Sequence, residues 1–157
     1  MRKLGIIAVL SLMLVALAAV PALAAPNFKS ATSSVANNGA LVVSFDERGL
    51  GNENIDYTLT GDGTATFACI NRGGKNPSAA NKQTQSFPVV ETASFEVKNG
   101  RVVESITSAA PSAGSFSCPG GQRLVLADVS YTNLVLTDTT NNVSTSVVDA
   151  SRTFFTV

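Results

Sequence analysis

The sequence contains no histidine and no tryptophan, and it has only two cysteines. Without histidine, the chain has no Ser-His-Asp or Cys-His nucleophile, no imidazole metal site and no histidine-based pH switch. Without tryptophan, it lacks the core residue that packs between the cysteines of true immunoglobulin domains. Both tyrosines, Tyr57 and Tyr131, have the alternation of core positions. The sequence therefore gives no support for a sugar-binding surface of stacked aromatic rings.

The first 24 residues predict a secretory signal peptide. A positively charged start precedes an uncharged apolar stretch at residues 4–20, and Ala22-Leu23-Ala24 supplies small residues for a signal peptidase. We expect cleavage after Ala24, because cleavage after Ala25 would place the ring of Pro26 directly behind the scissile bond. The alternative is an uncleaved anchor, since the apolar stretch is only just shorter than the roughly 20 residues of a spanning helix. The sequence predicts a secreted or periplasmic protein, free of the membrane after cleavage.

Composition beyond the signal peptide favours one all-β domain at residues 25–157. These 133 residues carry nine Lys or Arg against eleven Asp or Glu, a net charge of about −2. That balance gives no reason to expect nucleic acid or anionic lipid as a partner. Ser and Thr account for 31 of these residues and Asn for twelve, which is typical of strands joined by polar turns.

Cys69 and Cys118 are predicted to form a structural disulfide bond. An even number of cysteines in a small exported domain most simply indicates pairing, and there is no C-x-x-C motif for redox activity. Both cysteines lie two residues after a phenylalanine, and on a strand such a pair shares one face. We therefore expect each sulfur to point inward beside an aromatic ring. Closing a loop of about 50 residues should stabilise the fold by roughly 4 kcal/mol.

Alternation of apolar and polar residues predicts seven to nine short strands and no helix after the signal-peptide helix. Asn27 to Val35 is expected to be a polar edge strand, and residues 41–45 a half-buried one after the Asn37-Asn38-Gly39 turn. Gly61-Asp62-Gly63 interrupts the pattern of residues 55–69, as a turn or, as we favour, a bulge in one long strand. The expected fold is an antiparallel β-sandwich of the immunoglobulin-like kind.

Two further features concern how the strands connect. Asn99-Gly100 is a strong two-residue hairpin signal, and pairing across it would place Val97 beside Val102 and Ala93 beside Ile106. That register also places the apolar Phe95 opposite the charged Glu104, which indicates an edge strand or a shift in the register. In residues 123–138 the apolar parity switches near Thr132-Asn133, which indicates a bulge or a crossing between sheets. Residues 110–121 are predicted to be a loop that carries Cys118.

The candidate interaction site is the segment from Arg72 to Lys82, the longest without a strand pattern. Successive N–H groups around a Gly pair with flanking cations could cradle an anion. The alternative is a solvated loop next to the disulfide. The residues concerned are Arg72, Gly73, Gly74, Lys75, Asn76 and Lys82.

Carboxylates are the other candidate groups, although acidic residues beside turns are usually only solvated. Calcium prefers oxygen ligands, and five acidic residues lie near one connection between strands. These are Asp46, Glu47, Glu53, Asp56 and Asp62. The spacing matches no EF-hand loop, so we expect no cofactor, with Ca²⁺ as the alternative. A glycosidase would need two carboxylates in one cleft, and no such pair is evident from the sequence.

The segments around the two cysteines form a distinctive set: Cys69-Ile70-Asn71-Arg72-Gly73-Gly74-Lys75-Asn76-Pro77, Ala80-Asn81-Lys82, Ser117-Cys118-Pro119 with Gly121-Gln122, and the apolar stretch to Asp138. With these segments the chain resembles a family of small secreted bacterial proteins with a paired-Cys β-sandwich domain. The resemblance implies an exported bacterial protein with a disulfide bond between these segments. It transfers no functional residue.

These observations favour a non-catalytic extracellular module, a surface or matrix component or a binder of another macromolecule or of itself. The first alternative is a secreted inhibitor that presents residues 72–82. The second is a hydrolase that uses carboxylates, which requires two of them in one concave cleft.

Overall fold

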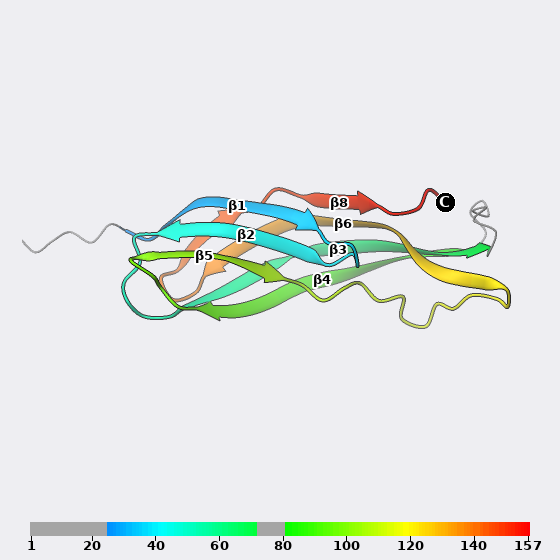
Figure 1. Cartoon of the computed structure of the whole chain (residues 1–157), viewed down its shortest axis with the longest axis horizontal. Coiled ribbons are helices and arrows are strands. Elements are labelled where there is room, and N and C mark those ends of the chain that lie inside the picture. The colour runs from blue at the N-terminus through cyan, green and yellow to red at the C-terminus, as the bar shows by residue number, and fades with distance from the viewer. Residues whose placement is uncertain (1–24, 72–80) are drawn as a thin grey trace, which may run out of the picture.

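A computed structural model describes residues 25–71 and 81–157 and shows two antiparallel sheets packed face to face (Figure 1). The smaller sheet has the strand order β1-β2-β5, and the larger has the order β4-β3-β6-β7, with β8 also paired to β6. The eight strands of the described residues are β1 (Asn27–Val35), β2 (Leu41–Arg48), β3 (Ile55–Asn71), β4 (Lys82–Phe95), β5 (Arg101–Thr107), β6 (Gln122–Asp138), β7 (Val143–Ser146) and β8 (Ala150–Thr153). The predicted β-sandwich and its number of strands are confirmed.

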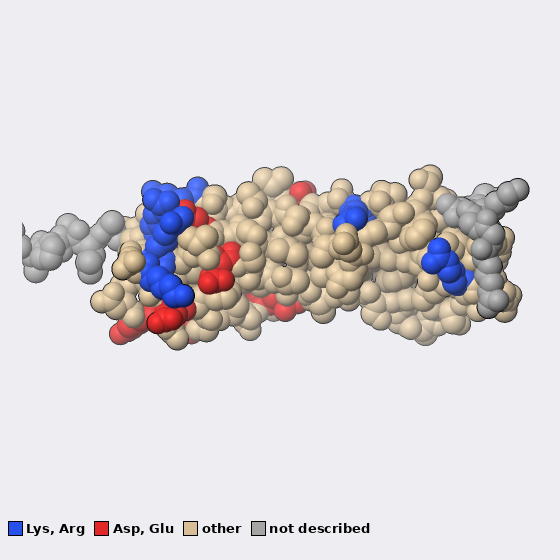
Figure 2. Space-filling model, in the orientation of Figure 1, with Lys and Arg blue, Asp and Glu red and all other residues tan. Residues whose placement is uncertain are grey.

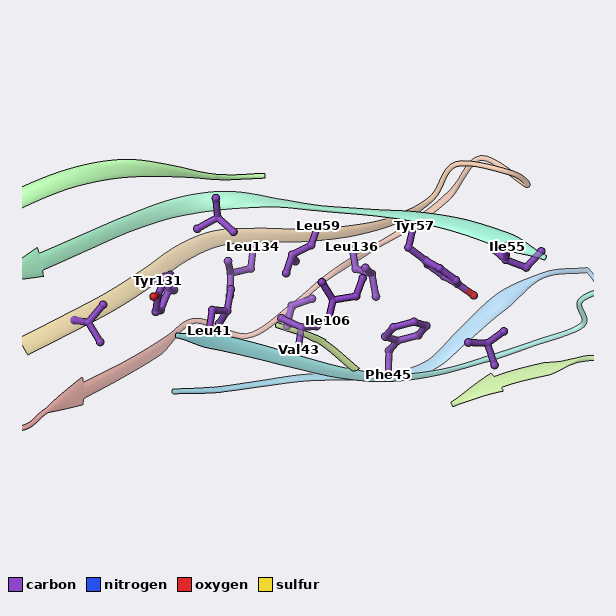
Figure 3. Packing of buried hydrophobic residues seen from close by; sticks show 14 of the residues in the cluster. Leu41, Val43, Phe45, Ile55, Tyr57, Leu59, Ile106, Tyr131, Leu134 and Leu136 are labelled. Carbon is purple, nitrogen blue, oxygen red and sulfur yellow. The ribbon is translucent and has the colours of Figure 1, made fainter. Parts of the chain in front are cut away.

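The main core lies between the two sheets and follows the alternation of the sequence. Every second side chain of β2 points inward, including Leu41, Val43 and Phe45. Figure 3 shows these side chains facing those of the larger sheet, among them Leu59 and Leu136. Burial of these apolar faces is the main stabilising contribution to the fold.

Two predicted irregularities allow β3 and β6 to run the length of the larger sheet. The register shifts between Thr60 and Asp62, where Gly61 alone lies opposite Asn133 and Leu134, so the extra residue of the bulge belongs to β6. Strand β3 continues as one long strand through Gly61, as favoured from the sequence, but the bulge expected within it lies in its partner. Asn133 of β6 has φ +54°, next to the predicted change of parity, and both halves of β6 stay in the same sheet. The bulge therefore keeps Tyr131 and Leu134 on the inner face although their parity differs.

The predicted pairing of β4 with β5 is wrong beyond the turn. Asn99 and Gly100 have positive φ values of 55° and 71°, as a tight hairpin turn requires, but only Lys98 and Arg101 form a bridge. Beyond it the strands separate into opposite sheets, where β4 pairs with β3 and β5 with β2. Separation lets Phe95 and Ile106 both pack in the core, and Glu104 lies opposite Phe45 of β2 instead of Phe95.

At the end of the molecule opposite the start of β1, β3 and β6 extend past the smaller sheet (Figure 1). We call this region, residues 67–71 and 122–127 with the segments 108–121 and 154–157, the disulfide end. Four side chains of these strands form a second buried cluster, against which Phe155 and Val157 pack: Ala68, Ile70, Val125 and Ala127. The N–H groups of Phe154 and Phe155 donate to Ala127 O, at 2.8 and 3.1 Å. The C-terminal segment thus covers a sheet face that the smaller sheet does not reach.

Candidate functional site

Cys69 and Cys118 form the predicted disulfide bond, with their Cα atoms 5.5 Å apart. Cys69 lies near the end of β3 and is 1% exposed. Cys118 lies in the predicted loop between β5 and β6, so only the first Phe-x-Cys pattern belongs to a strand. The bond attaches the irregular segment 108–121 to the central strand of the larger sheet.

The predicted interaction segment lies mostly outside the described residues. This holds for Arg72, Gly73, Gly74, Lys75 and Asn76, and Ala24 of the expected cleavage site lies outside them too. The described chain begins at Ala25, which accepts a hydrogen bond from the Asn27 side chain. Lys82 is the first residue of β4, and its Nζ lies 3.4 Å from Val157 O, to which it donates.

The residues that flank this segment are held together by hydrogen bonds. The Cys69 N–H donates to Asn81 O at 2.9 Å. The Asn81 amide donates to Gln122 Oε1 at 3.3 Å, and the Gln122 amide donates to Asn71 Oδ1 at 3.2 Å. Strands β3, β4 and β6 therefore meet at Asn71, Asn81 and Gln122, beside the disulfide bond.

The acidic residues considered as calcium ligands do not converge. Asp46 lies on the outer face of β2 and forms ion pairs with Arg101, at 2.7 Å, and with Arg48, at 3.0 Å. The hydrogen bonds from Arg101 and then Arg48 hold the pKa of Asp46 well below its usual range. Glu47, the next residue, points into the core instead. In residues 25–71 and 81–157, no three His, Cys, Asp or Glu side chains are close enough to hold a metal ion.

Asp56 and Asp62 are also too far apart to act together. They lie six positions apart on an extended strand, which corresponds to about 20 Å. Asp62 Oδ2 accepts a hydrogen bond from the Asn133 amide at 2.8 Å, so it braces the bulge where β3 and β6 change register. Asp56 lies near the beginning of β3, and the Thr139 N–H donates to its backbone oxygen at 2.8 Å. Neither geometry resembles a pair of catalytic carboxyl groups.

The structure instead brings together three buried polar side chains that the sequence analysis did not group. Glu47 of β2 and Asp138 of β6 are both 0% exposed, and Tyr57 of β3 is 1% exposed. Tyr57 Oη donates to Glu47 Oε2 at 2.8 Å, across the interface between the sheets. Tyr57 and Asp138 are cross-strand neighbours in the larger sheet. We call Glu47, Tyr57 and Asp138 the carboxyl cluster.

A signal for this cluster is nevertheless present in the sequence. Glu47 has the parity of Val43 and Phe45, and Asp138 has the parity of Leu134 and Leu136. The expectation that acidic residues beside turns are only solvated is wrong for Glu47. Position in the alternating pattern, rather than residue type, decides which way this side chain points.

The charge on Glu47 is disfavoured by its surroundings. Burial is the largest cause, and the negative charge and the hydrogen bond of Asp138 add to it, while the Tyr57 hydroxyl opposes them. Together these effects raise the pKa of Glu47 to about 7. Burial and the neighbouring Glu47 also raise the pKa of Tyr57 well above its usual range. At pH 7 Glu47 is therefore near the midpoint of its titration, whereas an exposed glutamate would already have lost its proton.

Two shallow hollows on the surface could contact a partner. A groove of about 290 Å³ runs between β4 and residues 108–112, and it is lined by Phe87, Pro88, Val89, Pro111 and neighbouring residues. The Ala109 N–H donates to Glu91 Oε1 in this groove, at 3.1 Å. The groove therefore offers mainly apolar contacts, and its one carboxylate already accepts a backbone hydrogen bond.

The second hollow lies along β5 and is lined by charged residues of both signs: Glu96, Lys98, Arg101 and Glu104, with Val102 and Val103. Figure 2 shows that Lys and Arg side chains on the visible face gather near the end of the molecule where β1 begins, with acidic side chains beside them. Because Arg101 is already bonded to Asp46, part of this positive charge is neutralised. Glu96 and Glu104 are two carboxylates that line one concave surface.

Comparison with known proteins adds no relative. The chain matches no family model, and neither the curated proteins nor the solved structures gave a significant match. In the part of the chain that the structure describes, no helix is long and apolar enough to cross a membrane.

Proposed function

We propose that the chain is exported from the cytoplasm and acts as a non-catalytic extracellular module, as a surface or matrix component or as a binder of another macromolecule. The Cys69–Cys118 disulfide bond is the observation that carries this proposal. Such bonds persist in oxidising compartments and are rare in the cytosol. A bacterial origin, an immunoglobulin-like sandwich and secretion through residues 1–24 belong to the same proposal.

The arrangement of the carboxyl groups supports a non-catalytic role. Glu47, the carboxyl whose pKa is raised, is enclosed between the two sheets, so a substrate would have to open the core to reach it. Catalytic carboxyl groups must contact their substrate in a cleft. Glu47 and Asp138 therefore act on the fold rather than on a ligand.

Intact mass of the exported protein, measured with and without reductant, tests export and the disulfide together. The expected species consists of residues 25–157, and reduction should add one pair of hydrogen atoms. A product that retains residues 1–24, or that carries free thiols before reduction, would contradict the proposal.

A secreted inhibitor that presents residues 72–82 is the second candidate. It is favoured by the hydrogen bonds among Asn71, Asn81 and Gln122, which fix both flanks of this segment beside the disulfide bond. A segment held at its base loses less conformational entropy when it binds an enzyme. Inhibition of a member of a protease and glycosidase panel, weakened by Lys75→Ala and by reduction, would establish it. If no enzyme is slowed, this candidate is removed.

A carboxylate hydrolase is the third candidate, and the hollow lined by Glu96 and Glu104 is the observation that favours it. Turnover of peptide, ester or glycoside substrates should then be lost in both Glu96→Gln and Glu104→Gln. A Glu53→Gln variant, which changes an exposed carboxylate outside this hollow, serves as a control. Turnover that depends on Glu96 and Glu104 would overturn the non-catalytic proposal.

A further inference from the structure

Two acidic side chains buried side by side need a compensating positive charge or a proton. Taking even one carboxylate out of water is costly, and two like charges at one site cannot both be stabilised. Glu47 and Asp138 are fully buried, and Tyr57, which donates to Glu47 Oε2, is the register neighbour of Asp138, so the negative charge of Asp138 acts on Glu47. The chemistry that balances their charge therefore decides how firmly this end of the sandwich is held.

The hydrogen bonds of the cluster leave one carboxyl oxygen without a donor. Asp138 Oδ1 and Oδ2 accept from the backbone N–H and the amide of Asn141, at 2.8 and 2.7 Å. Glu47 Oε2 accepts from Tyr57, whereas Glu47 Oε1 has no hydrogen-bond partner in the described structure. A proton on Oε1 would turn this oxygen into a donor towards Asp138.

Within residues 25–71 and 81–157, no Lys or Arg side chain bonds to this oxygen. From the larger sheet, Tyr57 and Asp138 are the titratable groups that face Glu47, and its neighbours in register on β1 and β5 are Phe28 and Val102. The charged groups next to Glu47 on β2, and the one beside them on β5, lie on the outer face of the smaller sheet: Asp46, Arg48 and Arg101. Rings of Phe28, Phe45 and Phe95 surround Tyr57, so the cluster lies in apolar surroundings.

A divalent cation fits this site less well than a proton. Calcium takes six to eight oxygen ligands, whereas three of the four carboxyl oxygens here already accept hydrogen bonds. We propose that Glu47 and Asp138 share one proton across the interface between the two sheets, and that loss of this proton at alkaline pH weakens the contact between them.

The direction of the pH dependence follows from the folded and unfolded states. In the unfolded chain Glu47 has its ordinary pKa of 4.5, whereas in the folded protein its pKa is about 7. The folded state therefore binds this proton more tightly, so the stabilisation is complete below pH 4.5 and is lost as the pH rises through 7. Between pH 5 and 8.5 the folding equilibrium constant should fall on the order of 50-fold.

The composition of the chain makes a change in stability between pH 5 and 8.5 easy to assign to one residue. The sequence has no histidine, so no ordinary side chain titrates between pH 5.5 and 8.5. The α-amino group titrates there, but it is common to every variant. A change in stability across this range can therefore be assigned by substituting one residue.

The test is urea denaturation of the oxidised, exported protein at pH 5 and pH 8.5. The wild type should be less stable at pH 8.5, whereas Glu47→Gln, whose amide donates at every pH, should show no such loss. The control variant Glu104→Gln changes an exposed carboxylate of the smaller sheet and should behave like the wild type. A wild type equally stable at both pH values, or a Glu47→Gln variant with the same loss, would overturn the proposal.

A second measurement avoids dependence on a variant that fails to fold. The carboxyl carbon of Glu47, followed by NMR in the wild type, should titrate with a midpoint near pH 7. A midpoint below pH 5 would overturn the shared proton. So would restored stability at pH 8.5 in millimolar CaCl₂ or MgCl₂ that Glu47→Gln abolishes, since a cation would then bridge the two carboxyl groups.

Discussion

Near the start of β1 the two sheets meet around Glu47, Tyr57 and Asp138, whereas at the opposite end Cys69 of β3 is bonded to Cys118. The first region is held by hydrogen bonds among buried polar groups, and the second by a covalent bond and a small apolar cluster. One region therefore responds to the proton concentration and the other to the redox state of the surroundings. A single β-sandwich can thus be stabilised at one end by buried polar hydrogen bonds and at the other by a disulfide bond.

The largest expected effect comes from removing the disulfide bond. The double variant Cys69→Ala/Cys118→Ala should lower the free energy of unfolding by about 4 kcal/mol, because the unfolded chain regains the entropy of a loop that spans 49 positions. Urea denaturation measures this loss, and the reduced wild type should show it too. The fall in stability between pH 5 and 8.5 should be unchanged, since Glu47 lies at the other end. A double variant with altered pH dependence would show that the two ends are coupled.

A smaller effect is expected from Tyr57→Phe, which removes the hydroxyl that donates to Glu47. Leaving that oxygen without its donor should lower the free energy of unfolding by about 1–3 kcal/mol. Because this hydrogen bond favours the charged form, its loss should also move the Glu47 titration above pH 7.

Tyr131→Phe is the matched control for this prediction. Tyr131 is also fully buried, and its hydroxyl donates to Gly39 O at 2.6 Å, away from the carboxyl cluster. This variant should lose stability and leave the Glu47 titration in place, as followed by NMR. If both variants move the titration equally, the hydrogen bond from Tyr57 is not what tunes Glu47.

At the disulfide end, Phe155→Ala should have a more modest effect. The ring packs over the second cluster, so its removal exposes Ala68 and Ile70 and should lower the free energy of unfolding by about 1–2 kcal/mol. Hydrogen exchange should accelerate at the end of β3 and stay unchanged around Tyr57. Val148→Ala, at a position that is 75% exposed, should alter neither. Faster exchange around Tyr57 in Phe155→Ala would show that the ends do not act separately.

The smallest effect is expected for Asp46→Asn on the outer face of β2. Its ion pairs with Arg48 and Arg101 lie at the surface, where salt screens them and their contribution is small. Thermal melting should show a slight loss of stability at low ionic strength that vanishes in high salt. A loss of stability as large as that of Tyr57→Phe, or one insensitive to salt, would contradict the small contribution expected of these ion pairs.

Most of the fold was predictable because alternation of apolar residues specifies which face of a strand is buried. Strand β1 and the continuity of β3 through Gly61 were identified from the sequence, as was the change of parity before Leu134. The pairing of β4 with β5 was not, because the Asn99-Gly100 turn determines only the local hairpin. Which sheet each strand joins depends on contacts between residues far apart in the sequence: β4, with Phe95, pairs with β3, and β5, with Ile106, pairs with β2.

The carboxyl cluster was harder to predict for a different reason. Glu47 and Asp138 are 91 positions apart, so their proximity depends on how two sheets are stacked and not on any local pattern. Residue type also argued for solvent exposure, since acidic side chains are rarely fully buried. Their parity on β2 and β6 was the available signal, and it becomes decisive only when the strand bounds are known.

The position of β6 in the chain has a consequence for the timing of folding. In the larger sheet, β3 pairs with β6, which ends only at Asp138. In the smaller sheet, β2 pairs with β5, which lies at residues 101–107. During synthesis from the N-terminus, neither sheet can therefore close until most of the chain has emerged from the ribosome. Topologies that depend on such distant pairings fold slowly. For a chain exported as proposed, this delay keeps it unfolded for passage through a secretion channel.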